Sequence, residues 1–148
     1  MSHNPTGHNP ADRRPPSADD IVRLGEEVLA ELPAFVRSRI GDVPIVVQDF
    51  AEADVLDEMG IEDPFELSGL YQGVPIGDRE QLSAPSGVPD LIFLYRRPIL
   101  DEWCEVDVSL KDMVRTVLVH EIGHHMGLSD DDIDRIEAAG RREEEAGG

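Results

Sequence analysis

Apolar residues recur at helical spacing in two long segments of the chain. The first segment begins near Ser17, which can cap a helix, and extends to Gly41 with a break or kink expected at Pro33. Its apolar face, which we expect to be buried, consists of Ile21, Leu24, Val28, Leu29, Leu32, Phe35 and Val36. The second segment covers residues 109–126 and has a broad apolar face, and its helix should end at Gly127.

Three shorter apolar segments predict strands. VPIVVQ from Val43 is rich in β-branched residues and indicates a buried strand. GLYQGVPI from Gly69 indicates a hairpin or a bent strand, and LIFLY from Leu91 indicates a core strand. Between these strands, the acidic residues 49–64 can hold a short helix, and the Pro-, Ser- and Gly-rich residues 77–90 predict a loop.

The two ends of the chain differ from its centre in composition. Residues 1–16 contain four prolines and almost nothing apolar, so we expect a disordered lead. His3 and His8 fall in this lead and are not assigned to any site. Residues 17–140 are expected to form a single domain, and residues 141–148 a frayed acidic tail.

Charge and cysteine content restrict the partners of the protein. The net charge of -19 would be repelled by nucleic acids and anionic membranes, and no apolar run approaches the ~20 residues of a membrane span. A basic peptide or protein would be attracted, although such acidity more often serves solubility. Cys104 is the single cysteine of the sequence, which excludes an intramolecular disulfide. With no secretory signal recognisable, we expect a cytoplasmic protein.

The sequence HEIGHHMGLSD combines an H-E-x-x-H motif with the extension x-x-G-x-x-D. His120 and His124 are four residues apart, so on a helix their rings point the same way and can bind one zinc ion. Glu121 would lie close to the metal without being a ligand. Gly127 can end the helix and turn the chain back, which brings Asp130 to the site as a third ligand.

Other residues near the motif could contribute to the site. His125 points away from the histidine pair and is expected beside the site or on the surface. Asp131 and Asp132 are alternatives for the third ligand that only the spacing disfavours, and Glu137 is a further candidate. Cys104 is more typical of a small buried hydrophobic residue than of a zinc ligand.

Three protein ligands leave one zinc position open, which is typical of a catalytic site. The matching reaction is hydrolysis of a peptide or amide bond by metal-activated water, with Glu121 as general base. Tyr71, Tyr95, Arg96 and Arg97 could assist the developing oxyanion, and nothing in the sequence selects among them. Two histidines and a carboxylate also suit iron, cobalt or manganese, so zinc is inferred partly from the motif.

Three segments of the sequence resemble the small bacterial zincin-like metallopeptidases, a minimal-zincin family. These segments are GLYQGVPI at 69–76, PDLIFLYRRPIL at 89–100 and RTVLVHEIGHHMGLSDDDID at 115–134. The resemblance extends from about Ala18 to Ile136. It implies a compact α+β domain in which a small mixed sheet packs against an N-terminal helix and the motif helix.

The resemblance also implies His120, His124 and Asp130 as ligands of Zn²⁺ and Glu121 as the catalytic acid and base. The leading hypothesis is therefore a zinc metallopeptidase acting on a peptide or protein. A catalytically silent zinc-bound module that binds a peptide or protein is the alternative, and an acidic structural domain without metal is the third. Glu121 favours catalysis, because a structural zinc site needs no carboxylate beside an open position.

Overall fold

The computed structural model describes residues 14–73 and 89–147. Most of the predicted N-terminal lead, including His3 and His8, lies outside these residues, as does most of the predicted loop at 77–90. Within the described part of the chain, no helix is long and apolar enough to cross a membrane.

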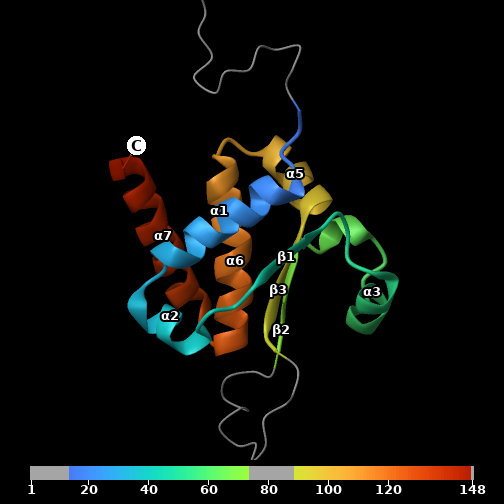
Figure 1. Ribbon diagram of the computed structural model, residues 1–148, viewed down its shortest axis with the longest axis horizontal. Helices are drawn as coiled ribbons and strands as arrows, with labels where there is room; N and C mark the ends of the chain where they lie inside the picture. Colours follow the sequence, from blue (N-terminus) through green and yellow to red (C-terminus); the bar gives the residue numbers. More distant parts are fainter. Residues whose placement is uncertain (1–13, 74–88, 148) are drawn as a thin grey trace, which may run out of the picture.

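Helices and a small sheet make up the fold, which is the predicted mixed α+β class (Figure 1). The helices are α1 (Ala18–Glu31), α2 (Ala34–Ile40), α3 (Ala53–Met59), the 3₁₀ turn η2 (Pro64–Glu66), α5 (Arg96–Glu105), α6 (Leu110–Met126) and α7 (Asp130–Gly147). The strands are β1 (Ile45–Gln48), β2 (Gly69–Gln72) and β3 (Leu91–Tyr95).

The sheet has the order β1-β3-β2, with β3 parallel to β1 and antiparallel to β2. The prediction of LIFLY as a core strand is confirmed, because β3 is central and Ile92 and Leu94 are fully buried. The residues of β1 are only half-buried, in contrast to the buried strand predicted there, because β1 lies at an edge of the sheet. The described part of GLYQGVPI forms one antiparallel edge strand, β2.

Helices cover the two faces of the sheet unequally. On one face α1 packs against β1, and α6 packs against both α1 and β2. The main core lies there and includes Ile21 and Val28 of α1, Leu94 of β3, and Leu118 and Ile122 of α6. Helix α3 lies on the opposite side of the sheet from α1 and α6 (Figure 1), next to a smaller apolar cluster around Tyr95.

The N-terminal helical segment is divided as the sequence predicts. Ser17 caps α1: its side chain accepts a hydrogen bond from the Asp20 N–H at 3.1 Å, and the Asp20 carboxylate accepts one from the Ser17 N–H at 2.8 Å. Pro33 then separates α1 from α2. This break changes the helical phase, so that Val36 is buried while Phe35, a predicted core residue, is 51% exposed.

Two helical regions differ from the sequence expectation. Helix α5 is not predicted by the sequence and follows β3 directly; Pro98 lies in its first turn, where the missing N–H breaks no helical hydrogen bond. Cys104 lies on α5 and is exposed, so its expected burial is wrong. Helix α7 continues to Gly147 through residues for which the sequence predicts a frayed tail, since this segment is mostly Arg, Glu and Ala, which favour helix.

Helices α6 and α7 are joined by a tight turn that confirms the predicted end of the motif helix. The Ser109 side chain caps α6 by accepting a hydrogen bond from the Asp112 N–H at 3.0 Å. Gly127 ends α6 in the left-handed conformation, with φ of 73°. Helix α7 then packs so closely on α6 that a Cβ added at Gly123 would lie 2.5 Å from Cγ1 of Ile133.

We therefore predict that Gly123→Ala destabilises the protein by about 1–3 kcal/mol, because the added methyl group overpacks the contact between α6 and α7. Ile133→Ala should cost about 2–5 kcal/mol by leaving a cavity. The double variant should be less destabilised than the sum of the two, since the shortened side chain on α7 makes room for the methyl group added on α6. Denaturant unfolding measures all three, and strict additivity would contradict this packing.

Candidate metal centre

The H-E-x-x-H motif occupies the last two turns of α6. This part of the helix buries Leu118 and Ile122 in the core, while His120 and Glu121 are half-buried and His124 is exposed. The rings of His120 and His124 are neighbours, with centroids 6.3 Å apart. The structure therefore brings the two predicted histidines together on the side of α6 that the core leaves accessible.

A hydrogen bond fixes how His120 presents its ring. Its Nδ1 atom lies 2.8 Å from the backbone oxygen of Thr116, one helical turn earlier. A carbonyl oxygen can only accept, so Nδ1 carries the hydrogen and Nε2 keeps its lone pair. This tautomer fits a zinc ligand, because metal-binding histidines commonly donate their second ring N–H to a carbonyl or carboxylate.

Glu121 follows His120 and is electrostatically linked to both histidines. Burial raises the pKa of the Glu121 carboxyl above its ordinary value, and the nearby His124 and His120 oppose this shift. A carboxyl group with a raised pKa accepts a proton more readily than an exposed glutamate does. The structure thus places a potential proton acceptor beside the two imidazoles.

The third predicted ligand is less closely associated with the pair. Asp130 is exposed and is the first residue of α7. Asp131 is also exposed, and Asp132 lies within 3.8 Å of Arg135. Among the residues that the structure describes, no three His, Cys, Asp or Glu side chains lie close enough together to hold an ion. The two imidazoles fit zinc, and the complete ligand set stays a prediction.

His125 has a separate environment. Its ring stacks on Tyr71 of β2, with centroids 3.7 Å apart and planes 16° from parallel. The Tyr71 hydroxyl donates a hydrogen bond to the Asp90 carboxylate at 2.8 Å. His125 is therefore held against the sheet, and it provides a contact between the motif helix and β2.

Among the four residues considered for the oxyanion, Tyr95 is linked to Glu121. Tyr95 is 1% exposed at the end of β3. Burial raises the pKa of its hydroxyl to about 12, and the negative charges of Glu52 and Glu121 add to this shift. The phenol therefore keeps its proton at neutral pH and is sensitive to the charge of the site.

The two arginines have partners elsewhere. Arg96 donates hydrogen bonds to the backbone oxygen of Pro16 at 2.7 Å and to the Asp49 carboxylate at 3.2 Å. The guanidinium of Arg97 lies over the ring of Phe50, 5.7 Å from its centroid. These contacts attach α5 to neighbouring segments and give neither arginine an interaction with the motif.

Glu137 on α7 lies beside the motif in a way that the sequence does not reveal. Its Oε1 atom is 3.4 Å from Nδ1 of His120, and the residue is only 7% exposed. The sequence suggests it as a third ligand, but the nearby nitrogen is the one directed at Thr116. In the sequence, Glu137 follows Ile133 by four residues, and this spacing is the only indication that Glu137 lies on the buried face of α7.

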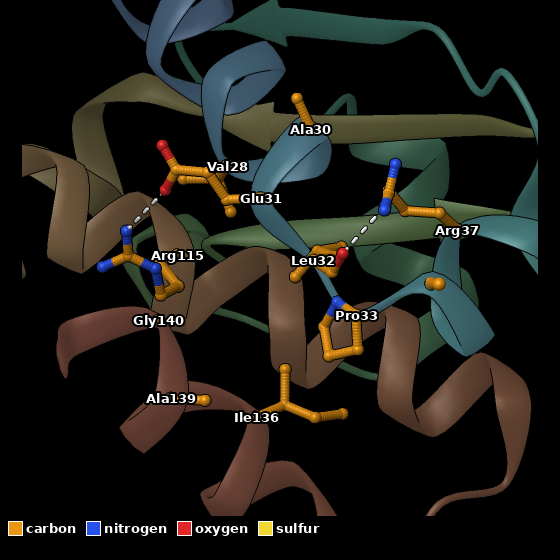
Figure 2. A pocket seen from close by; sticks show the side chains of 11 residues that line it. Val28, Ala30, Glu31, Leu32, Pro33, Arg37, Arg115, Ile136, Ala139 and Gly140 are labelled. Atoms are coloured by element: carbon orange, nitrogen blue, oxygen red, sulfur yellow. Dashed lines mark hydrogen bonds and ion pairs between the residues drawn. The ribbon is translucent and has the colours of Figure 1, made fainter. Parts of the chain in front are cut away.

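A pocket of about 490 Å³ lies between α1, α2, α6 and α7, and none of the motif residues lines it (Figure 2). Arg115 is fully buried at its wall and pairs with Glu31 at 3.2 Å and Asp112 at 3.1 Å. Arg37 donates a hydrogen bond to the backbone oxygen of Leu32 there. The Arg115–Glu31 ion pair attaches α6 to α1 and so helps to fix the helix that carries the motif.

Comparison with known proteins identifies the class of this chain. A family model described as "zincin-like metallopeptidase" matches residues 40–140 of the 148. The matched region contains the whole sheet, α6 and the first half of α7. No curated protein is similar enough in sequence to match.

Glu121 should lower the stability of the metal-free protein at neutral pH. Because its folded pKa is raised, the folded state loses stability as pH rises through the interval from the unfolded to the folded pKa. We predict that Glu121→Gln raises the melting temperature in the presence of a chelator at pH 7, and that the gain disappears below about pH 4. Glu105→Gln, at an exposed position, is the control. An equal gain in both variants would contradict the prediction.

Proposed function

The chain belongs to the zincin-like metallopeptidase family, and we propose that it is a zinc-dependent peptidase with Glu121 as its general base. The observation that carries this proposal is the grouping of Glu121 with His120 and His124 on one side of α6. A structural zinc site would use its donors as ligands, whereas here a proton acceptor lies beside two imidazoles.

We assign His120, His124 and Asp130 as the zinc ligands. The tautomer of His120 supports its role, since Nε2 retains its lone pair. Gly127 supports the role of Asp130, because the left-handed turn directs the chain back toward the end of α6. When bound, a zinc ion supplies Lewis-acid chemistry that activates water and polarises a carbonyl group.

Peptide hydrolysis requires proton transfers, which we assign to Glu121. Glu121 takes a proton from the attacking water and later delivers it to the leaving amine, and its raised pKa suits both steps. Tyr95 is buried and keeps its hydroxyl proton at neutral pH, so it adds no negative charge next to Glu121.

An extended peptide is the substrate that the surrounding structure favours. Among the described residues, β2 is an outer strand of the sheet and lies next to the second half of α6: Gly69 approaches Val117, and Tyr71 stacks on His125. Edge strands bind extended peptides through their free backbone groups. A peptide paired with β2 would run alongside the motif.

The net charge of -19 favours substrates with basic residues near the cleaved bond. We place the protein in the cytoplasm on its single cysteine. A zinc-bound module that binds a peptide without cleaving it is the competing function, and the second of the two experiments below separates it from a peptidase.

The first experiment tests the ligands. We predict that His120→Ala, His124→Ala and Asp130→Ala each weaken zinc binding by at least tenfold, whereas His125→Ala, whose ring stacks on the sheet, retains zinc. Titration against a chromophoric chelator gives the affinities. Asp131→Ala is the control for Asp130, and a larger loss at Asp131 would reassign the third ligand.

The second experiment tests catalysis. Glu121→Gln should keep one zinc per chain and reduce cleavage of a peptide library by at least about 100-fold, because the general base is lost. Glu105→Gln, an exposed change of the same kind, should retain activity. If the wild type and Glu121→Gln bind zinc equally and are equally inert, the protein is a binding module instead.

A further inference from the structure

Glu137 is a buried carboxylate that the proposed reaction does not use. It lies on the core-facing side of α7, in the turn after Ile133, and between them Ile136 is also buried. Only 7% of Glu137 is exposed. Its Oε1 atom accepts no hydrogen bond from any residue that the structure describes.

Burying a carboxylate without a cation or a full set of donors is unfavourable, so such a residue needs a compensating interaction. The group nearest to providing one is the Nδ1–H of His120, 3.4 Å from Oε1. That distance is longer than a well-formed N–H···O hydrogen bond, so the neutral imidazole compensates the carboxylate only in part. The same N–H donates to the Thr116 backbone oxygen at 2.8 Å.

His120 is thus held between two acceptors on different helices. Thr116 belongs to α6 itself, while Glu137 belongs to α7. Both acceptors lie at Nδ1, so both favour the ring orientation and tautomer in which Nε2 is available to a metal. The carboxylate adds negative charge next to the ring, which makes Nε2 a stronger donor toward a cation.

We propose that Glu137 is a positioning residue that orients His120 for the metal and couples metal binding to the docking of α7 on α6. If His120 held a cation, its Nδ1–H would be a stronger donor toward the buried Glu137 carboxylate and would compensate more of that charge. Metal binding then strengthens the contact between the two helices, and an undocked α7 weakens metal binding by the same factor. The inference rests on the proposed role of His120 as a ligand.

Glu137→Gln removes the negative charge with little change in the shape of the side chain, and Glu137→Ala removes the hydrogen-bond acceptor entirely. Asp134→Asn, on an exposed position of the same helix, is the matched control for the loss of one carboxylate. We expect Glu137→Gln to weaken zinc binding by about 10-fold and Glu137→Ala by about 10–100-fold. Asp134→Asn should change it by less than about twofold.

Two further readouts separate positioning from simple packing. In the wild type, zinc should slow amide hydrogen exchange in α7, and Glu137→Gln should show a smaller effect. Metal-free Glu137→Gln should be at least as stable as the wild type, because a buried uncompensated charge is removed. A residue that only fills space would lower the metal-free stability and leave zinc affinity unchanged.

The outcomes distinguish this inference from the proposed function. If the wild type binds zinc through His120 and both Glu137 variants bind it equally well, the positioning role is overturned and the proposed function stands. If the wild type does not bind zinc, or His120→Ala binds it as well as the wild type, both are overturned. Should Glu137→Ala fail to fold, the nearly isosteric Gln variant decides.

Discussion

The site depends above all on how α6 is packed. Val114, Leu118 and Ile122 follow one another at intervals of four residues and are all buried, which fixes the rotation of the helix about its axis. Once that rotation is fixed, the helical repeat determines where His120 and His124 point. The same hydrophobic burial that stabilises the domain therefore orients two predicted ligands, which need no long loop to hold them.

Electrostatics at this end of α6 works against the metal-free fold. The pKa of Glu121 is raised by burial, and Glu137 is buried beside His120 with only a long contact to it. Two carboxylates in partly desolvated positions reduce stability unless a cation is near. A divalent cation bound to the histidines would relieve both, so in the proposed zinc enzyme metal binding and folding stability are linked. Such a loss of stability at a functional site is common in enzymes.

Local patterns of apolar residues and helix caps predict most of the fold. The capped N-terminal helix, LIFLY as a core strand and the motif helix ending at Gly127 all depend on local patterns, and the structure confirms them. The prediction for Phe35 is wrong because a proline break resets the helical phase by an amount that the pattern does not show. Helix α5 is not predicted because a proline such as Pro98 normally ends a helix, and the sequence does not show that Pro98 lies in the first turn, where proline is tolerated.

In the site, too, contacts within one helix can be predicted from the sequence, whereas contacts between elements cannot. The spacing of His120, Glu121 and His124 within one helix can be interpreted from sequence alone, and the structure brings these side chains together. The contact of Glu137 with His120 depends on how α7 crosses α6, and the link between Tyr95 and Glu121 depends on the sheet. Neither contact can be predicted from the sequence, because the spacing of side chains within one element does not give the angle at which two elements pack.

This division bears on the choice between a peptidase and a silent binding module. The proposed general base and two of the proposed ligands belong to one helix, so their relative positions are set mainly by the geometry of that helix. The proposed third ligand and Glu137 lie on α7, beyond a short turn, so in the proposed enzyme metal affinity would depend on the docking of that helix. In the proposed enzyme, loss of α7 docking would therefore weaken metal binding, whereas loss of Glu121 would remove only the proton transfer. Because Glu121 lies next to both imidazoles and burial raises its pKa, the arrangement favours the proposed peptidase over a silent module.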